Sequence, residues 1–265
     1  APILGRVSSQ PTSAWSVGGA AALQEHAPTA AAALSGLVAL WPASVDEITL
    51  TTVRMVTAEG LGLPPLPRPP TGPRRSAPVP QAVVMAFAEQ FGVDVAAIGD
   101  QLRTAWLEAM GRAAFDAALA VYVADLVPRV RSVLGTLFGR DEWVDAPLVR
   151  SEHARLTMDE FIHEVALLDH LDPVTTELVR LRGARQHHCR VCMARRDLGA
   201  VRAGADAELF LALDDYRRST LDPAQQAALA LTDALIWTPA NLRARDVEAV
   251  RAHLSPAETV EVVLD

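Results

Sequence analysis

The sequence has 265 residues, of which 50% are hydrophobic and 21% charged, so it can bury a large core and is unlike a disordered chain. Its formal net charge of -8 provides no broad basic surface for nucleic acid. Every basic side chain other than histidine is arginine, and the absence of lysine excludes Schiff-base chemistry.

The N-terminal residues, Ala1 to Leu4, contain no basic group in front of an apolar run, so they are not typical of a secretory signal. Every long apolar stretch is interrupted by charged residues or proline before it reaches the ~18 residues of a membrane span. The two cysteines, Cys189 and Cys192, lie too close together to form a secreted disulfide scaffold. We therefore expect a cytoplasmic protein that binds neither membrane nor nucleic acid.

Helical periodicity dominates the chain, and strict two-residue alternation is rare. One amphipathic helix is predicted from Gln81, and the helical pattern continues from Leu107 to Leu126. Turn signals separate such segments at Pro64 to Pro80, Gly139 to Pro147, Leu221 to Pro223 and Thr238 to Pro239. These patterns predict an all-α fold. The tract from Leu63 to Pro70 favours polyproline geometry, either as a stiff surface loop or as a ligand for an aromatic groove.

An internal repeat indicates two helical units, residues 1–140 and 141–265. Residues 45–54 resemble residues 171–180 at an offset of 126 positions. Arg75-Ser76 ahead of Pro80 likewise resembles Arg218-Ser219 ahead of Pro223. The repeat is degenerate where chemistry is expected, because the positions that correspond to Glu177, Cys189 and Cys192 hold Thr51, Leu63 and Leu66.

The last segment begins as a helix, with Ser255 as N-cap, Pro256 at N1 and Glu258 at N3. The pattern then stops, whereas the first unit continues past the corresponding point. We therefore expect a further helix to follow in the complete second unit.

Cys189 and Cys192 form a Cys-x-x-Cys motif, which we place at the start of a helix. The preceding helix is predicted to begin at Asp172-Pro173. Free amides at a helix start, together with neighbouring arginines, favour thiolate over thiol. Cys189, Cys192 and Arg196 fall at i, i+3 and i+7, which predicts one shared helix face.

Three interpretations of the motif remain open from these residues. They are a redox dithiol, a pair of buried structural cysteines, and half of a zinc site completed by His187 and His188. Four ligands within such a short stretch cannot easily surround a tetrahedral ion, so we expect no metal and no other cofactor.

The spacing of Glu177, eleven intervening residues, Cys189-x-x-Cys192, three further residues and basic Arg196 resembles the alkylhydroperoxidase D and carboxymuconolactone decarboxylase superfamily. Gly199 and the apolar helix after Pro223 are similar to the elements that follow the site in that family. The resemblance covers most of the second unit, and the first unit only as a degenerate copy.

The resemblance implies a duplicated helical bundle that assembles as a homo-oligomer, with a trimer favoured for two-unit chains. It implies that the Cys192 thiolate attacks a hydroperoxide, that Cys189 resolves it to a disulfide, and that Glu177 anchors a proton relay. An external dithiol, such as a lipoyl group on a partner protein, would then reduce the disulfide.

The sequence departs from the family pattern at two places. Arg196 stands where peroxidase members commonly have histidine, and Val191 stands between the cysteines. Because a guanidinium stays protonated, Arg196 can stabilise a thiolate but cannot shuttle a proton. His187 or His188 could supply acid-base catalysis instead, or one could simply cap the turn while the other is solvated.

The other histidines and tryptophans have simpler interpretations. His163 and His170 are predicted to share one face of the helix that precedes Asp172 and to have a surface or packing role. Trp41 and Trp237 are predicted core or interface anchors.

The leading functional hypothesis is a thiol-dependent peroxidase-like oxidoreductase, with a hydroperoxide or another small molecule as substrate. The same superfamily contains lactone decarboxylases, which do not use the dithiol, and these form an alternative. A non-enzymatic redox-sensing oligomeric module is the third.

Overall fold

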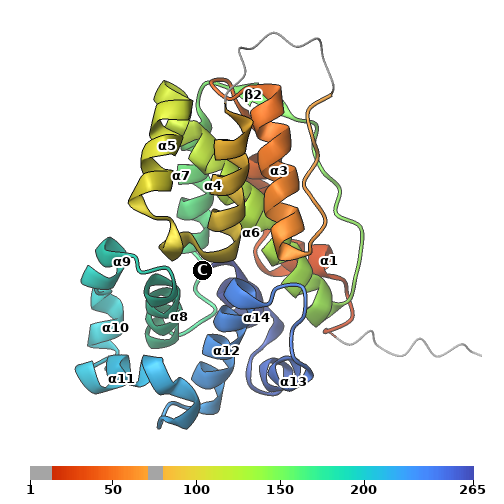
Figure 1. Ribbon diagram of the computed structural model, residues 1–265. Coiled ribbons are helices and arrows are strands. Elements are labelled where there is room, and N and C mark those ends of the chain that lie inside the picture. The colour runs from red at the N-terminus through yellow and green to blue at the C-terminus, as the bar shows by residue number, and fades with distance from the viewer. Residues whose placement is uncertain (1–13, 71–79) are drawn as a thin grey trace, which may run out of the picture.

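The computed structural model describes residues 14–70 and 80–265 (Figure 1). This part of the chain is mostly helical, which confirms the predicted all-α class. The N-terminal residues Ala1 to Leu4 and the Arg75-Ser76 pair lie outside the described residues. Within the described ranges, no helix combines the length and apolarity that a membrane crossing requires.

The first half of the chain ends in α6, a helix of 25 residues. The elements up to that point are α1 (Gly19–His26), α2 (Pro28–Ala39), α3 (Glu47–Leu61), α4 (Gln81–Asp94), the 3-10 turn η1 (Val95–Ala97), α5 (Asp100–Met110), η2 (Gly111–Ala113) and α6 (Ala114–Phe138). The continuous periodicity predicted from Leu107 to Leu126 is wrong at one point. Gly111 adopts a φ of 52°, which glycine tolerates readily, and the chain turns there between α5 and α6.

The second half contains shorter helices. They are α7 (Ala154–Ala166), α8 (Pro173–Gln186), α9 (Arg190–Ala194), α10 (Leu198–Arg202), α11 (Ala207–Ala212), η3 (Leu213–Arg218), α12 (Pro223–Trp237), α13 (Ala244–His253) and α14 (Pro256–Leu264). Figure 1 shows α3 to α7 in the upper part of the view and α8 to α13 in the lower part, with α14 near the level where they meet.

A short parallel sheet joins the two halves. Its strands are β1 (Leu40–Pro42) and β2 (Val149–Ser151), and Trp41 lies opposite Arg150. The Arg150 guanidinium lies 5.2 Å from the centre of the Trp41 ring, while the indole N–H donates to the Val45 carbonyl at 2.7 Å. Trp41 therefore acts as a half-buried packing anchor at this junction.

Three hydrophobic clusters form the core of the described residues. One lies within α3 to α6 around Leu50 and Phe87, and another lies among α8, α10, α11 and α12 around Leu178 and Phe210. The largest cluster combines α1, α2 and α6 with α12 and α14, so it draws residues from both sides of the predicted boundary at residue 140. Because α6 contributes residues to two of these clusters, it packs against elements from both halves of the chain.

The helix starts at α3 and α8 make the same hydrogen bonds. The Asp46 side chain accepts the amide and the hydroxyl of Thr49, at 3.0 and 2.7 Å. The Asp172 side chain accepts the corresponding two groups of Thr175, with the amide at 3.1 Å. An acidic N-cap satisfies amides that have no partner within the helix. Both helices therefore begin where the repeated motif predicts.

Arginine side chains at matching positions in these two helices bind backbone carbonyl groups. Arg54 on α3 is 1% exposed and donates to the carbonyls of Val38 and Pro67. Arg180 on α8 donates to the carbonyls of Cys192 and Arg195, at 3.0 and 3.1 Å. In each half, an arginine of the capped helix therefore donates hydrogen bonds to a segment that follows that helix.

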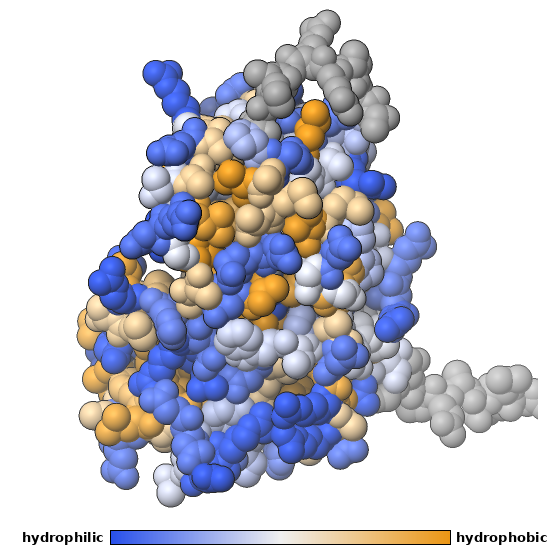
Figure 2. Space-filling view, in the orientation of Figure 1, coloured by the Kyte–Doolittle hydropathy of each residue, from blue (hydrophilic) through white to orange (hydrophobic). Residues whose placement is uncertain are grey.

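Apolar side chains remain exposed on α10 and α11. Leu198 and Leu211 are 66% and 74% exposed, and Figure 2 shows apolar colour over this lower corner of the face in view. Individually exposed apolar residues are normal in folded proteins.

Candidate redox site

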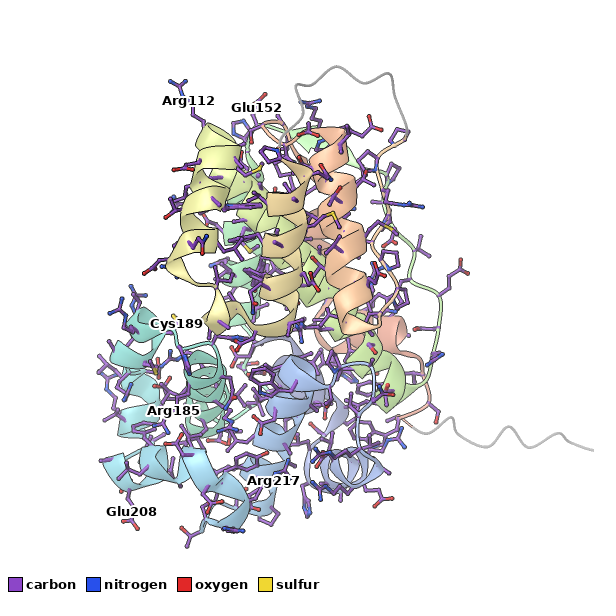
Figure 3. All side chains as sticks on the ribbon, in the orientation of Figure 1. Arg112, Glu152, Arg185, Cys189, Glu208 and Arg217 are labelled. Carbon is purple, nitrogen blue, oxygen red and sulfur yellow. A yellow bond between two sulfur atoms is a disulfide. The ribbon has the colours of Figure 1, made fainter. Side chains whose placement is uncertain are left out.

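Cys189 and Cys192 are joined by a disulfide at the start of α9. Cys189 is the N-cap residue of this helix, and its Sγ accepts the backbone amide of Cys192 at 3.3 Å. Figure 3 shows Cys189 between the upper and lower groups of helices. The expected position of the motif at a helix start is therefore present in the fold.

The two histidines ahead of the motif lie in different surroundings. His187 is the C-cap of α8 and lines a cavity beside the disulfide. Burial, and secondarily the charge of Arg129, lowers the pKa of His187, which favours the neutral imidazole. His188 has a φ of 50° and does not line that cavity, and both histidines are exposed to solvent. Of the two, only His187 faces the space next to the sulfurs.

Glu177 forms an ion pair with Arg180. Its carboxylate is 1% exposed and accepts Nε and Nη2 of Arg180 at 2.7 and 2.9 Å, as well as the amide of Asp197 at 3.3 Å. This contact raises the pKa of the Arg180 guanidinium. In the described part of the chain, no hydrogen bond joins Glu177 to Cys189 or Cys192. The Glu177 carboxylate instead contacts Arg180, and Arg180 in turn donates to the Cys192 carbonyl.

Arg196 does not continue the helix of the cysteines. α9 ends at Ala194, and Arg195 is extended, with φ -87° and ψ 146°. The expectation that Arg196 shares a helix face with the cysteines is therefore wrong, because the helix stops before reaching it. The Arg196 guanidinium donates to the Met193 and Arg195 carbonyls and lies 5.1 Å from the centre of the Phe210 ring.

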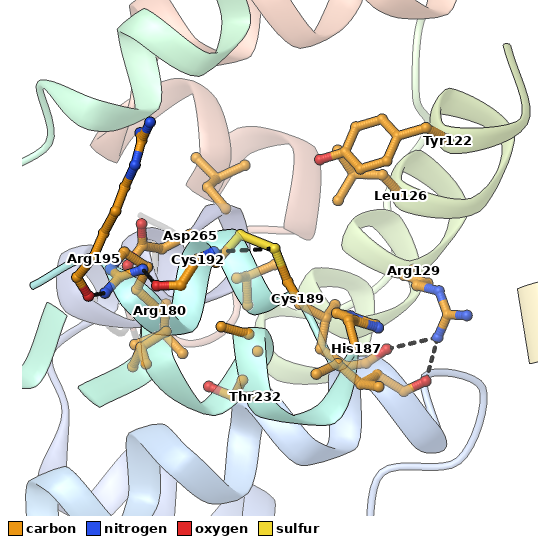
Figure 4. Close-up of a pocket in the computed structure, with 18 of the residues that line it drawn as sticks. Tyr122, Leu126, Arg129, Arg180, His187, Cys189, Cys192, Arg195, Thr232 and Asp265 are labelled. Carbon is orange, nitrogen blue, oxygen red and sulfur yellow. Dashed lines mark hydrogen bonds between the residues drawn. A yellow bond between two sulfur atoms is a disulfide. The ribbon is translucent and has the colours of Figure 1, made fainter. Parts of the chain in front are cut away.

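A cavity of about 690 Å³ lies beside the disulfide (Figure 4). Both cysteines line it, and so do side chains of α6, α8, α12 and α14. Apolar groups such as Val179 and Ile236 make up much of the wall. Arg196 also reaches the lining, whereas Glu177 lies behind Arg180 and does not. The disulfide thus faces a partly open cavity large enough for a small organic molecule.

Two Mycobacterium tuberculosis proteins, uncharacterized protein MT2376 and uncharacterized protein Rv2313c, are each 42% identical to this chain over 240 residues. Each match covers 88% of this chain and 83% of the relative. The chain belongs to their family. No family model matches the sequence, and no solved structure matches it. The names of these relatives state no activity, so the function has to be argued from the site.

Sequence reasoning missed the wall of the cavity that α6 provides. Tyr122, Asp125, Leu126 and Arg129 all line the cavity from this helix. Burial raises the pKa of Asp125, and Arg129 beside it acts in the opposite direction through an ion pair of 2.8 Å. The available signal was the pair of Asp125 and Arg129, which lie one turn apart among apolar residues in the unit that has no cysteines.

The remaining predicted residues lie outside this cavity. α7 ends at Ala166, so His170 does not share a helix face with His163, contrary to the prediction; its amide is bound by Glu261 at 2.7 Å instead. Trp237 is 45% exposed and donates to the Gln186 side chain at 3.0 Å. Among the described residues, no group of three or more His, Cys, Asp or Glu side chains could hold a metal ion.

Proposed function

We propose that this protein is a thiol-dependent, peroxidase-like oxidoreductase in which Cys189 and Cys192 alternate between dithiol and disulfide. The observation that carries the proposal is the position of the pair, at a helix start and on the wall of a cavity of about 690 Å³. Helix-start Cys-x-x-Cys pairs are suited to thiolate chemistry, because one sulfur ionises and the other resolves. The cavity can accommodate the organic part of a hydroperoxide.

The proposed reaction reduces one hydroperoxide and oxidises two thiols. A thiolate attacks the outer oxygen, forming an S–O bond while the O–O bond breaks, and the inner oxygen leaves with the electron pair and takes up a proton as the alcohol. The second sulfur then attacks the sulfenic acid, forming the disulfide and releasing water. An external dithiol, such as a lipoyl group on a partner protein, would return the pair to its reduced form by thiol–disulfide exchange.

The roles of the two sulfurs can be separated. The family resemblance assigns the attack to Cys192 and the resolving step to Cys189. The amide hydrogen bond at the start of α9 instead goes to the Sγ of Cys189, and an amide donor stabilises a thiolate. Cys189 is therefore the sulfur that we expect to ionise first once the bond is reduced.

We further propose that the fold is the duplicated bundle of the alkylhydroperoxidase D-like type. The matching helix starts at Asp46 and Asp172 support this proposal, as does the packing of α3 against α4 and of α8 against α12. In this interpretation the first unit has lost its thiols and contributes α6 to the site of the second. The trimer implied for two-unit chains is part of the same proposal.

The experiment is a single-turnover oxidation with a count of free thiols. The reduced protein is mixed with cumene hydroperoxide, and we expect both thiols to be lost as one equivalent of alcohol forms. Cys192→Ser and Cys189→Ser are compared with the parent, and the double variant serves as the control for hydroperoxide consumed by the five methionines. Equal hydroperoxide consumption by the parent and the double variant would contradict the proposal.

A redox switch without turnover is the second candidate. It is favoured by the absence, in the described residues, of a hydrogen bond that connects Glu177 or His187 to either sulfur. This candidate predicts that hydroperoxide oxidises the pair once and that dihydrolipoamide supports no sustained consumption. Continuous turnover with dihydrolipoamide would exclude the switch and support the enzyme.

A further inference from the structure

α6 places a phenol on the wall of the cavity beside the disulfide. Tyr122, Asp125, Leu126 and Arg129 fall at i, i+3, i+4 and i+7, so they lie on one face of the helix. Figure 4 shows the Tyr122 hydroxyl directed toward the interior of the cavity, on the side of the disulfide. The cysteine-free half of the chain therefore contributes a polar group to the redox cavity.

The charged members of this face are engaged with the protein itself. Asp125 accepts Nε of Arg129 at 2.9 Å. The Arg129 guanidinium also donates to the backbone carbonyls of Gly92 and Leu235, at 2.6 and 3.1 Å. These contacts join the ends of α4 and α12 to α6, which is a structural role. They leave Arg129 with little capacity to bind a ligand.

Tyr122 differs from its neighbours on this face. Within residues 14–70 and 80–265, its hydroxyl has no hydrogen bond to another protein group. Its side chain is 37% exposed, and it lines both this cavity and a smaller one of about 210 Å³ that adjoins it. The other tyrosine, Tyr216, by contrast donates its hydroxyl to Asp233 at 2.9 Å. A donor without a protein partner in a cavity is available to a ligand.

We propose that Tyr122 donates its phenolic hydrogen to an oxygen atom of the molecule that occupies this cavity. The catalytic part of the proposal rests on the proposed function: in hydroperoxide reduction, the acceptor is the inner oxygen, which carries the electron pair when the O–O bond breaks. The apolar side chains of Val179, Leu235 and Val263 would contact the organic group attached to that oxygen.

The surroundings of Tyr122 keep the phenol protonated. Although Tyr122 is 37% exposed, the protein around it desolvates the phenol, and this desolvation, together with the negative charge of Asp125, raises the pKa of Tyr122 to about 12. The departing alkoxide is a much stronger base than a phenolate, because alcohols, like water, are far weaker acids than phenols. The phenol can therefore pass its proton to the alkoxide, and the tyrosinate recovers a proton from water.

The first test measures binding without any reaction. Cumyl alcohol, the product expected from cumene hydroperoxide, is titrated into the oxidised protein by calorimetry. Loss of one neutral hydrogen bond in Tyr122→Phe should weaken binding about 3- to 10-fold. Tyr216→Phe is the matched control and should bind as the parent does. Equal affinity in the parent and Tyr122→Phe, or no binding by the parent, would overturn the proposal.

The second test measures the rate at which the reduced proteins are oxidised. We expect Tyr122→Phe to react with cumene hydroperoxide about 10- to 100-fold more slowly than the parent, because general acid assistance is lost. Oxidation by dithiodipyridine should be unchanged, since its leaving group is a stable thiolate that needs no proton. Equal rates with the hydroperoxide, or equal slowing with both oxidants, would contradict a role as proton donor.

The two tests separate this inference from the proposed function. A parent protein that is inert to hydroperoxide overturns the peroxidase assignment, while alcohol binding that depends on Tyr122 still supports the donor. A reactive parent with an equally reactive Tyr122→Phe variant supports the peroxidase assignment and overturns the donor.

Discussion

Removal of Arg180 tests whether Glu177 is a buried structural anion. The Glu177 side chain is 1% exposed and that of Arg180 is 31% exposed, and their closest contact is 2.7 Å. In Arg180→Met the carboxylate stays buried without its cation, a change that typically costs about 3–5 kcal/mol. Because water can reach the place that Arg180 vacates, we expect about 3 kcal/mol. Glu177→Gln loses only charge-assisted hydrogen bonds and should cost about 2 kcal/mol.

The double variant makes the argument quantitative. When Glu177→Gln is combined with Arg180→Met, the unpaired carboxylate that Arg180→Met leaves at position 177 is no longer present, so the loss should be about 2–3 kcal/mol rather than the sum of the two single losses. Urea unfolding followed by circular dichroism at neutral pH gives the three free energies. Arg103→Met is the matched control, because its pair with Asp100 is 58% and 97% exposed and should contribute less than about 0.5 kcal/mol. Additive losses, or a loss below about 1 kcal/mol in Arg180→Met, would refute the reasoning.

Four further predictions concern the cysteines, the two tyrosines and Arg54. At mildly acidic pH, iodoacetamide should alkylate Cys189 in the Cys192→Ser variant faster than it alkylates Cys192 in the Cys189→Ser variant. The reason is that Cys189 accepts the helix amide, which stabilises its thiolate. The reverse order would contradict this prediction. Burial raises the pKa of Tyr122 to about 12 and also raises that of Tyr216, so tyrosinate absorbance should not rise at the ordinary value of about 10. The two tyrosines should make stability fall as the pH rises from about 10 toward 12, because each releases in the unfolded chain a proton that it retains in the folded state; Arg54, whose pKa burial lowers, offsets this fall only in part. Thr51→Glu should add about 1 kcal/mol to the free energy of unfolding, because it places a carboxylate beside Arg54 as Glu177 does beside Arg180. Burial lowers the pKa of Arg54 to about 10, so its guanidinium has a charge to pair. Lower stability of the variant in urea would count against this prediction.

Local signals predicted the helix starts of the second unit. Asp172 and Ser255 are N-caps followed directly by proline, as their sequence patterns indicate. The placement of Cys189 at a helix start also followed from local pattern. These features depend on bonds within one turn of helix, so neighbouring residues suffice to specify them.

Features that depend on distant contacts could not be predicted in this way. The position of Arg196 differs from the expectation because Arg180, from the preceding helix, holds the carbonyls of Cys192 and Arg195 where α9 ends. The contribution of Tyr122 depends on how α6 packs against α12 and α14. The pair of Asp125 and Arg129 marks this face of α6 in the sequence, but it does not indicate which elements pack against that face. Sequence spacing identified the pair of cysteines but not the surface that faces them.

The shared cavity has a consequence for how the family can diverge. Cys189 and Cys192 belong to the short segment around α9, whereas the opposite wall belongs to α6, more than fifty positions earlier in the chain. Under the proposed function, substitutions on α6 can reshape the volume offered to a substrate while the sulfur chemistry stays the same. Selectivity and reactivity would then evolve separately, and relatives with identical cysteines would differ in what they accept.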